Sequence, residues 1–555
     1  MAKIHSLKIH NYRGIEKFEH TFGSTNFVCL IGRGDSGKTT ILNAISAVLS
    51  PNWNYTFFDT DFYNGDISNN IVIEANIIEV PSELLTESKF GLYKRLLNSS
   101  NEIIDDITLE TDDCADILSI KLVVKNDLEP KWYIFNGRIQ QEDIEISSYD
   151  RAKLNVFLVS DYLDKHFSWS KGTPLFSLRK QSDLKSETNK LLLDANRKAK
   201  EVFLKTKPLD SLDSVVSLIK DSAATIGLSL DDLSALIDNK DSMLNEGNIS
   251  LHVDSIPCRL KGKGSKRLLS IAIQLELAKK GGIVLIDEVE QGLEPDRVKF
   301  LVNRLFNNKQ GQVFITTHSN NVLVEIDAKG IFLKKAEQHS LVTFDECFQG
   351  CIRNNPEAFF SKRIIVCEGA TEVGICRALN EFRIESGESN FEMLGISLVD
   401  GTGANFIKYC FDFFAAGIDV CAFCDSDDPA INEKKKELIN IGIQVVDCSA
   451  GCSIEQQLFN DLPWEKVTRL VKYAEIERSE QGILANTGKL SKSELTDQDL
   501  PGIRILLGNA AKQHDWFKRI ELGKKLGRVW FNSLSEITSK HLHTQYCHLS
   551  SWINK

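Results

Sequence analysis

The chain has 555 residues, of which 42% are hydrophobic and 26% charged, and its formal net charge is −11. This length predicts two or three domains, and the composition is that of an ordinary globular protein. No run approaches the roughly 18 uncharged apolar residues of a membrane span. The N-terminus lacks a signal-peptide pattern, so we expect a cytoplasmic protein with no membrane partner. The acidic balance argues against a general nucleic-acid coat.

Two local features qualify this picture. Many of the 13 cysteines lie in apolar runs, which predicts small core residues in a reducing compartment. Basic residues are concentrated between Gly502 and Lys555, where nine Lys or Arg face three acids, and between Arg259 and Arg267, where five cations meet no acid. Contact with phosphate requires such local basic surface, although most basic clusters are only solvated faces.

The predicted elements begin with strands. Apolar runs predict strands at Ile4–Ile9, Asn26–Ile31, Ile71–Val80 and Ser119–Val124. Residues 183–244 differ, because apolar side chains recur there at helical spacing and Pro208 divides the region into at least two helices. The helical stripe consists of Leu212, Val215, Val216 and Ile219. Strand patterns return at Gly282–Ile286 and Gln312–Thr316, and a second α/β region begins near Ser361.

These elements predict an α/β protein with two domains. The first covers residues 1–165 and 251–345, with a helical insertion at residues 166–250. The second covers residues 358–555, and the connector lies within residues 338–357.

A phosphate-binding loop follows the second predicted strand. The segment Gly32-Arg-Gly-Asp-Ser-Gly-Lys-Thr39 matches the pattern G-x-x-x-x-G-K-[ST] between an apolar strand and a helix-like segment. Lys38 can neutralise the β- and γ-phosphates of a nucleotide, and Thr39 can ligate its Mg²⁺. The loop residues predicted to hold ATP are Gly32, Gly34, Gly37, Lys38, Thr39 and Thr40.

Polar residues that follow two later predicted strands should belong to the same nucleotide site. Residues 283–286 lead into Asp287, which would hold Mg²⁺ through water, and into Glu288, which would polarise the attacking water. Residues 313–317 lead into His318, which could sense the γ-phosphate or be an ordinary hydrogen-bonded strand end.

A Gly-Ser turn lies between these segments. Ser265 precedes a helix predicted to begin near Leu268, and a helix start offers N–H donors to an anion. The whole order resembles ABC-type ATPase heads of the structural-maintenance and recombination-protein kind. The resemblance implies that ATP joins two heads, with Ser265 of one head on the γ-phosphate of the other, and therefore a homodimer or higher oligomer. The turn departs from the usual Leu-Ser-Gly-Gly form, and the insertion could be a dimerisation or clamp element or a plain helical subdomain.

In the second half of the chain, three predicted apolar strands each end in an acid. These acids are Glu368, Asp400 and Asp425. Carboxyl ends of parallel strands meet at one sheet edge, so these acids should lie together. Strand alternation adds Asp427, and helical spacing adds Glu372. Such a cluster can hold two metal ions for phosphodiester cleavage, since metal-bound water is a usable nucleophile. The predicted ligands of Mg²⁺, or of Mn²⁺, are Glu368, Glu372, Asp400, Asp425, Asp427 and Glu455.

The ordered set Glu368-Gly-x-Thr-Glu372, Asp400-Gly-x-Gly and Asp425-x-Asp427 resembles a Toprim domain. Together with the ATPase head, it resembles the overcoming-lysogenization-defect (OLD) family of ATP-dependent endonucleases over essentially the whole chain. The resemblance implies an ATPase with a helical dimerisation insert and a Mg²⁺-dependent DNA nuclease in antiphage defence, as in Gabija-like or retron-associated systems. Its partners would be DNA, a second copy of the chain, and an accessory defence protein or retron RNA or DNA.

The resemblance also assigns a lysine. Family nucleases use a Lys downstream of the acids, and Gly523-Lys524-Lys525-Leu-Gly527 is the matching segment. Lys524, or Lys525, would stabilise developing phosphate charge beside the catalytic acids Glu368, Asp425 and Asp427; alternatively both are helix-surface lysines. Glu455 fits the family's later acid, but Gln456 stands where a second acid often follows, so the ligand set of the second metal stays open.

Three other functions remain open. One is topoisomerase- or primase-like chemistry, although no nucleophilic Tyr domain is evident. Another is an ATP-switched clamp that senses a partner through a degenerate metal site. The third is RNA, such as tRNA, as the substrate in place of DNA.

Overall fold

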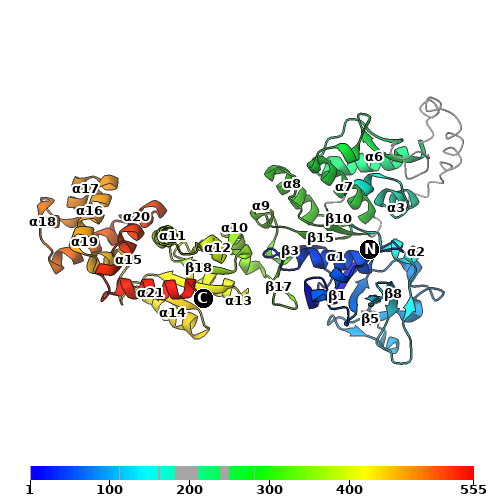
Figure 1. Ribbon diagram of the computed structural model, residues 1–555, viewed down its shortest axis with the longest axis horizontal. Coiled ribbons are helices and arrows are strands. Elements are labelled where there is room, and N and C mark those ends of the chain that lie inside the picture. Colours follow the sequence, from blue (N-terminus) through cyan, green and yellow to red (C-terminus); the bar gives the residue numbers. More distant parts are fainter. Residues whose placement is uncertain (1, 112, 161–162, 182–209, 238–248, 280–281) are drawn as a thin grey trace. The chain divides into compact units, whose positions relative to one another are not determined.

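The computed structural model describes residues 2–111, 113–160, 163–181, 210–237, 249–279 and 282–555 (Figure 1). The chain divides into two compact units, Met1–Glu346 and Cys347–Lys555. The helical pattern predicted for residues 183–209, with its break at Pro208, and for residues 238–244 lies outside the described residues. No helix in the described ranges is long and apolar enough to cross a membrane.

The first unit contains a six-stranded, mostly parallel sheet. Its apolar central strands are fully buried, as expected for parallel strands that are covered on both faces. Only the last strand pairs antiparallel. In spatial order the strands are β10 (Val156–Val159), β14 (Ile283–Ile286), β15 (Gln312–Thr316), β3 (Phe27–Ile31), β16 (Ile331–Lys334) and β17 (Leu341–Thr343).

A second, antiparallel sheet of eight strands packs with the first around one core. The helix α1 (Lys38–Val48) contacts strands of both sheets, so the segment after the phosphate loop lies at the centre of the unit. The strands are β1 (Lys3–Tyr12), β2 (Ile15–Thr21), β4 (Ile71–Ile78), β5 (Arg95–Leu97), β6 (Ile103–Ile104), β7 (Ala115–Val124), β8 (Pro130–Phe135) and β9 (Ile144–Glu145). The strands predicted in this half are confirmed, with ends shifted by up to four residues.

Helices α3, α6 and α7 pack together in the first unit, as Figure 1 shows in cyan and green. The helical stripe predicted in α6 is confirmed, because all four of its apolar residues are buried. Residues 166–250 also contain strand, so the region is not purely helical. The elements are α2 (Ser148–Arg151), α3 (Pro174–Gln181), α6 (Asp210–Thr225), β11 (Leu233–Ile237), β12 (Ile249–Val253), β13 (Ile256–Pro257), α7 (Lys263–Ala278), α8 (Pro295–Phe306) and α9 (Asn320–Leu323).

The predicted connector is folded into the two units. Residues 341–343 form β17, which pairs with β16 in the first unit. Residues 349–354 form α10 (Gln349–Asn354) in the second unit. The division therefore falls between Glu346 and Cys347, because apolar residues such as Leu341 and Ile352 are buried on either side of it.

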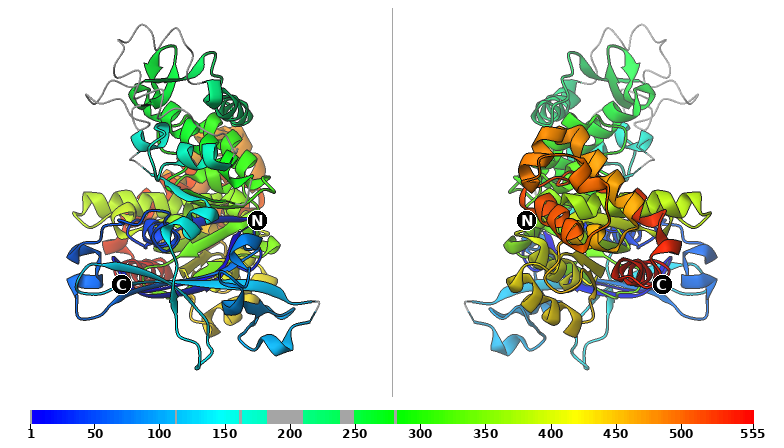
Figure 2. Two further views of the ribbon diagram at one scale, coloured as in Figure 1. Left: turned by 90° about the vertical axis from the view of Figure 1, so that its right-hand side faces the viewer. Right: turned by 90° about the vertical axis from the view of Figure 1, so that its left-hand side faces the viewer.

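The second unit is built on a four-stranded parallel sheet with its own apolar core. The strand order is β19 (Ile396–Asp400), β18 (Arg363–Cys367), β20 (Asp419–Cys424) and β21 (Gln444–Asp447). Helices from α16 to α19, drawn in orange in Figures 1 and 2, form a group that contacts α15 and α20. The helices are α11 (Ala370–Glu385), α12 (Phe391–Leu394), α13 (Phe406–Ala415), α14 (Pro429–Asn440), α15 (Ile454–Asp461), α16 (Trp464–Arg478), α17 (Glu480–Thr487), α18 (Ser493–Thr496), α19 (Pro501–Gln513), α20 (Ile520–Phe531) and α21 (His541–Ile553).

Helices α11 and α20 pack unusually closely because glycines line their contact. A Cβ on Gly374 would lie 2.2 Å from the carbonyl oxygen of Ile520, and one on Gly523 would lie 2.2 Å from that of Thr371. One on Gly527 would lie 2.6 Å from the Cβ of Ala378. The segment Gly523–Gly527 is therefore a helix-packing motif.

Candidate functional site

The phosphate loop closes tightly between β3 and α1. Gly32 and Gly37 have φ angles of 140° and 96°, which favour glycine. A Cβ on Gly32 would lie 2.3 Å from the carbonyl oxygen of Lys334, so only glycine fits there. Gly34, by contrast, has open space, and Thr40 lies in the first turn of α1.

Lys38 is buried at the base of this loop. Its Nζ donates to the carbonyl oxygens of Gly32 (2.9 Å) and Arg33 (2.7 Å). Burial lowers the pKa of Lys38 to about 8, against the opposing effect of carboxylates that include Asp287 and Glu288. The ammonium group is thus held where the phosphates of a nucleotide would lie.

Asp287 joins the phosphate loop to two neighbouring strands. Its Oδ1 accepts hydrogen bonds from Thr39 Oγ1 (3.0 Å) and Thr316 Oγ1 (2.6 Å). The backbone N–H of Glu288 donates to Thr316 Oγ1 at 2.7 Å, and Glu288 has a φ of 47°, which is uncommon for a residue with a side chain. The predicted Thr39, Asp287 and Glu288 therefore meet, and Thr316 is an additional member. Strand register could have found it, because Ile286 lies opposite Ile315.

His318 is held at the same sheet edge by Glu290. The two Glu290 oxygens accept from the backbone N–H of His318 (2.7 Å) and from Thr317 Oγ1 (2.8 Å). Burial, followed by the charge of Lys38, lowers the pKa of His318. A neutral imidazole beside Lys38 is compatible with a phosphate-sensing role, and Glu290 is a second residue that the sequence pattern did not single out.

The Gly-Ser segment lies inside α7. The helix begins at Lys263, not near Leu268, because Gly262 is its N-cap and Ser265 lies in its first turn. A Cβ on Gly264 would lie 2.5 Å from the carbonyl oxygen of Gly292, so packing within the unit already requires this glycine.

Arg267 joins α7 to residues 287–291, which follow β14. Its Nη1 donates to Gln291 Oε1 at 2.7 Å, and its Nη2 donates to the backbone carbonyl of Asp287. The contact of Ser265 with a second head stays a prediction.

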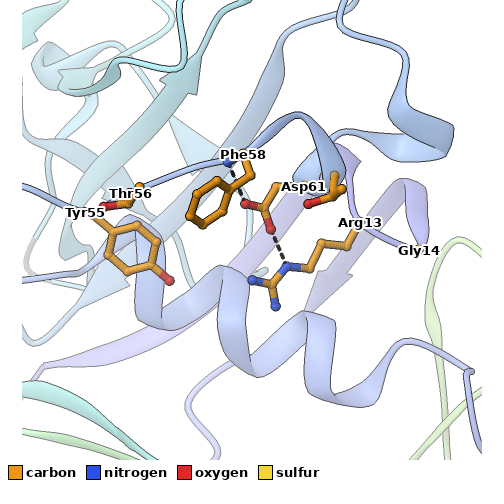
Figure 3. Close-up of a pocket in the computed structure, with 7 residues that line it drawn as sticks. Arg13, Gly14, Tyr55, Thr56, Phe58 and Asp61 are labelled. Atoms are coloured by element: carbon orange, nitrogen blue, oxygen red, sulfur yellow. Dashed lines mark hydrogen bonds and ion pairs between the residues drawn. The ribbon is translucent and has the colours of Figure 1, made fainter.

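A cavity of about 720 Å³ opens beside the turn between β1 and β2 (Figure 3). Arg13 Nε pairs with Asp61 Oδ1 at 2.7 Å, and the rings of Tyr55 and Phe58 also line the cavity. The turn adjoins the phosphate loop, because the Cγ1 of Ile15 lies 3.3 Å from where a Cβ on Gly37 would be. The remaining lining residues are Gly14, Thr56 and Thr60.

In the second unit, backbone N–H groups hold the strand-end acids together. Glu368 Oε2 accepts from the N–H of Asp425 at 2.9 Å, which joins the ends of β18 and β20. Asp425 Oδ1 accepts from the N–H of Ile454 at 2.7 Å, which adds the start of α15. Burial, followed by Asp427, accounts for the raised pKa of Glu368.

Glu372 and Glu455 lie deepest among these acids. Glu372 Oε2 accepts from the N–H of Gly369 at 3.0 Å, and Glu455 Oε2 accepts from Ser453 Oγ at 2.9 Å. Burial first, and then the charges of Asp425 and Glu455, raise the pKa of Glu372 well above its usual range. The pKa of Asp425 is raised well above its usual range by burial first and then by Glu455. A cation bound among these carboxyl groups would favour their ionised forms.

Asp400 and Asp427 lie at the same edge but are already engaged. Asp400 Oδ1 accepts from the N–H of Thr402 at 2.8 Å and holds the turn after β19. Asp427 Oδ2 lies 2.6 Å from the Nζ of Lys512 in α19.

The predicted lysine pair of α20 contacts other residues. Lys524 Nζ lies 2.5 Å from Glu381 Oε1 on α11, and Lys525 Nζ lies 3.7 Å from Glu477 Oε1. Lys435 Nζ donates to the backbone carbonyl of Asp425, and its charge opposes the rise in the pKa of Glu368. Lys512 and Lys518 also act on the acid cluster; the pKa of Lys518 is raised by Asp515 first, and Glu455 and Glu372 also contribute. Both belong to the basic C-terminal stretch, which was the available sequence signal.

Comparison with known proteins identifies the two units. Residues 27–325 match the family model described as "AAA domain, putative AbiEii toxin, Type IV TA system". Residues 359–427 match the model described as "Overcoming lysogenization defect protein-like, TOPRIM domain". The chain belongs to the OLD family. It joins a P-loop ATPase domain to a TOPRIM domain, as its motifs predict.

Other proteins are similar to this OLD-family chain at low sequence identity. A protein of Vibrio cholerae serotype O1 biovar El Tor named "Retron Vc95 probable ATPase" is 23% identical over 382 residues, which span 59% of this chain and 73% of that protein. The Smc head domain with an extended coiled coil bound to the C-terminal domain of ScpA, from Pyrococcus furiosus, aligns over 62% of this chain and 97% of that chain, with 14% identity and a TM-score of 0.40. The SmcHead bound to the C-winged helix domain of ScpA aligns over the same shares, with 15% identity and a TM-score of 0.36.

The OLD-family acids fit a hard divalent cation by their donor chemistry. Carboxylate oxygens are the ligands that Mg²⁺ and Mn²⁺ prefer, and burial with mutual repulsion raises the pKa of Glu368, Glu372 and Asp425. Within the described residues, no group of three or more His, Cys, Asp or Glu side chains is arranged as a ready metal site. Some carboxylates now held by N–H groups would have to turn to ligate a cation.

Proposed function

We propose that this protein is an ATP-controlled, Mg²⁺- or Mn²⁺-dependent endonuclease that cuts or nicks DNA in cytoplasmic antiphage defence. Its ATPase and TOPRIM domains support an ATP-dependent nuclease in a defence-like setting. The observation that carries the metal-dependent step is the gathering of acids at one sheet edge, where the N–H of Asp425 binds Glu368 and the N–H of Ile454 binds Asp425, and where burial, followed by Asp425 and Glu455, raises the pKa of Glu372.

In the first unit, ATP would bind along the edge formed by the phosphate loop, β14 and β15. Lys38 would neutralise the β- and γ-phosphates, Thr39 and Asp287 would hold the nucleotide's Mg²⁺, and Glu288 would orient water. His318 and the amides of the loop would bind the γ-phosphate. Two heads would close on ATP through Ser265, which gives a homodimer as the working state.

The cavity beside Arg13 would accept the nucleotide base and ribose. Tyr55 and Phe58 supply ring faces, and the Arg13–Asp61 pair supplies polar groups. Phe58→Ala should then weaken ATP binding but leave binding of inorganic triphosphate unchanged. Isothermal titration of both ligands checks this, and equal losses for both would exclude the base-binding role.

In the second unit, Glu368, Glu372, Asp425 and Glu455 would hold the metal, with Asp400 and Asp427 at the rim of the site. The metal, when bound, supplies an activated water and charge stabilisation. The chain's own contribution is to bury Glu372 and Glu455 and to place the charge of Lys518 where it acts on both of them. Lys518 is our candidate for stabilising developing phosphate charge, with Lys524 as the alternative that the segment Gly523–Gly527 suggests.

Cleavage of supercoiled plasmid with Mg²⁺ or Mn²⁺, with and without ATP, tests the proposal. Asp425→Asn and Glu368→Gln should abolish cutting, whereas Lys38→Met should remove its response to ATP. Lys518→Met should slow cutting more than Lys524→Met. Intact plasmid under every nucleotide condition, or unchanged cutting by Asp425→Asn, would refute the nuclease. Cleavage of RNA alone, or resealed relaxed plasmid, would favour the other TOPRIM chemistries.

A further inference from the structure

The acid cluster of the second unit is neutralised unevenly. Glu372 and Glu455 are buried and Asp425 is half-buried. Burial and neighbouring acids raise the pKa of Glu372 and Asp425. Burial also raises the pKa of Glu455, where the charge of Lys518, whose ion pair is with Asp515, opposes the rise. Asp427 instead has a cation at its carboxylate, because Lys512 Nζ lies 2.6 Å from its Oδ2. The Asp427 side chain is only 16% exposed, so this ion pair is partly shielded from water.

The backbone of α19 fixes the position of Lys512. Arg504, Gly508 and Lys512 are spaced four residues apart and share one helix face. Arg504 Nη1 donates to the carbonyl oxygens of Phe459 and Leu462, both at 2.8 Å, at the end of α15. At Gly508 the helices approach so closely that a Cβ would lie 3.1 Å from the Cα of Gln456. The next residue on this face, Lys512, is thereby directed at Asp427.

The residue after Glu455, Gln456, offers no further anionic ligand for a metal. Gln456 follows Glu455 in the first turn of α15, and both ends of its amide are bonded. Its Oε1 accepts from the N–H of Ser453 at 2.8 Å, and its Nε2 donates to Asn509 Oδ1 at 2.7 Å. The structure therefore supplies a cation at Asp427 and a neutral amide at the position after Glu455.

We propose that the ammonium group of Lys512 takes the place of a second divalent cation, so that this site binds one metal ion per chain. Two-metal sites place two cations about 3.5–4 Å apart on shared carboxylates. Here Lys512 would provide the second positive charge at Asp427, and the metal would bind on the side of Glu372, Asp425 and Glu455. The inference rests on the proposed metal-dependent function.

Counting Mn²⁺ by electron paramagnetic resonance on the full-length, nucleotide-free protein tests this. Subtracting the count of an Asp425→Ala variant removes ions bound elsewhere, including in the ATPase unit. After this subtraction, we expect one Mn²⁺ per chain in the wild type and two in Lys512→Met. We expect one in Lys512→Arg, which keeps the positive charge. Lys466→Met, which removes a surface charge elsewhere in the second unit, should also leave one.

A difference of two in the wild type, or of one in Lys512→Met, would overturn the role of Lys512. A difference of zero in the wild type would instead refute the metal site on which the proposed function depends, so the two failures are distinguishable. Circular dichroism establishes that each variant is folded, and Lys512→Gln replaces Lys512→Met if the latter does not fold. In the cleavage assay, Lys512→Met should shift the Mg²⁺ dependence from a slope of about one to about two.

Discussion

Buried charges of opposite sign characterise the two sites at the scale of single residues. Lys38 is a buried cation whose pKa falls to about 8, chiefly because of burial. Glu372, which is buried, and Asp425, which is half-buried, are carboxyl groups whose pKa values are raised well above the usual range by burial and by other acids. Each site is therefore set to receive the missing charge, a polyphosphate in the first unit and a cation in the second.

The lowered pKa of Lys38 predicts proton uptake when ATP binds. At pH 8 about half of the Lys38 amines are neutral in the free protein, because the pKa is about 8. Phosphate charge raises this pKa, so binding should take up about half a proton per ATP. Calorimetric titration in buffers of different ionisation enthalpy measures the uptake, which should vanish at pH 6 and in Lys38→Met. An unchanged uptake in Lys38→Met would assign the proton to another group.

Glu288 should act on hydrolysis and not on binding. Glu288→Gln removes the base but keeps the size of the side chain, so ATP hydrolysis should fall by about 10²–10⁴-fold with little change in ATP affinity. Phosphate release and nucleotide titration measure the two effects separately. Glu294→Gln, at the N-cap of α8, serves as the control. A matching loss of ATP affinity would argue for a structural role of Glu288.

At the scale of elements, close helix packing explains residues that look catalytic in the sequence. The glycines that flank Lys524 and Lys525 allow α20 to approach α11, and Lys524 pairs with Glu381 on that helix. Gly264 is likewise required by packing, because a Cβ there would clash with the carbonyl oxygen of Gly292. A glycine next to a polar residue therefore indicates a site only after its packing role has been examined.

Substitution at this helix contact should cost stability. In Gly527→Ala the new Cβ would lie 2.6 Å from the Cβ of Ala378, so the helices must separate. We expect a loss of about 1–3 kcal/mol in the free energy of unfolding of the second unit. Urea denaturation measures it. Gly502→Ala, a helical glycine with no atom within 4 Å of its added Cβ, is the matched control and should be neutral or slightly stabilising. Equal effects of the two variants would contradict the packing account.

At the scale of the whole molecule, the two units have separate apolar cores. Each also carries its own candidate ligand site. Ligand binding stabilises the state that binds it, by about 2.7 kcal/mol at a concentration of 100 times Kd.

Calorimetry should therefore show two unfolding transitions with different ligand responses. ATP should raise only the transition of the first unit, and Mn²⁺ without nucleotide should raise chiefly that of the second. Lys38→Met should abolish the response to ATP and leave the response to Mn²⁺ unchanged. Asp425→Ala should do the reverse. A single transition that both ligands shift equally would show that the units unfold together.

Local patterns in the chain were sufficient for the fold class, the phosphate loop and the strand-end acids. These depend on short-range periodicity and on glycine conformation, which neighbouring residues largely determine. The division at Glu346, the start of α7 at Lys263 and the lysines facing the acids required the tertiary structure. Which lysines lie near the acids depends on which helix face packs where, and contacts between residues far apart in the chain, such as Gly374 with Gly523 and Gln456 with Gly508, decide it.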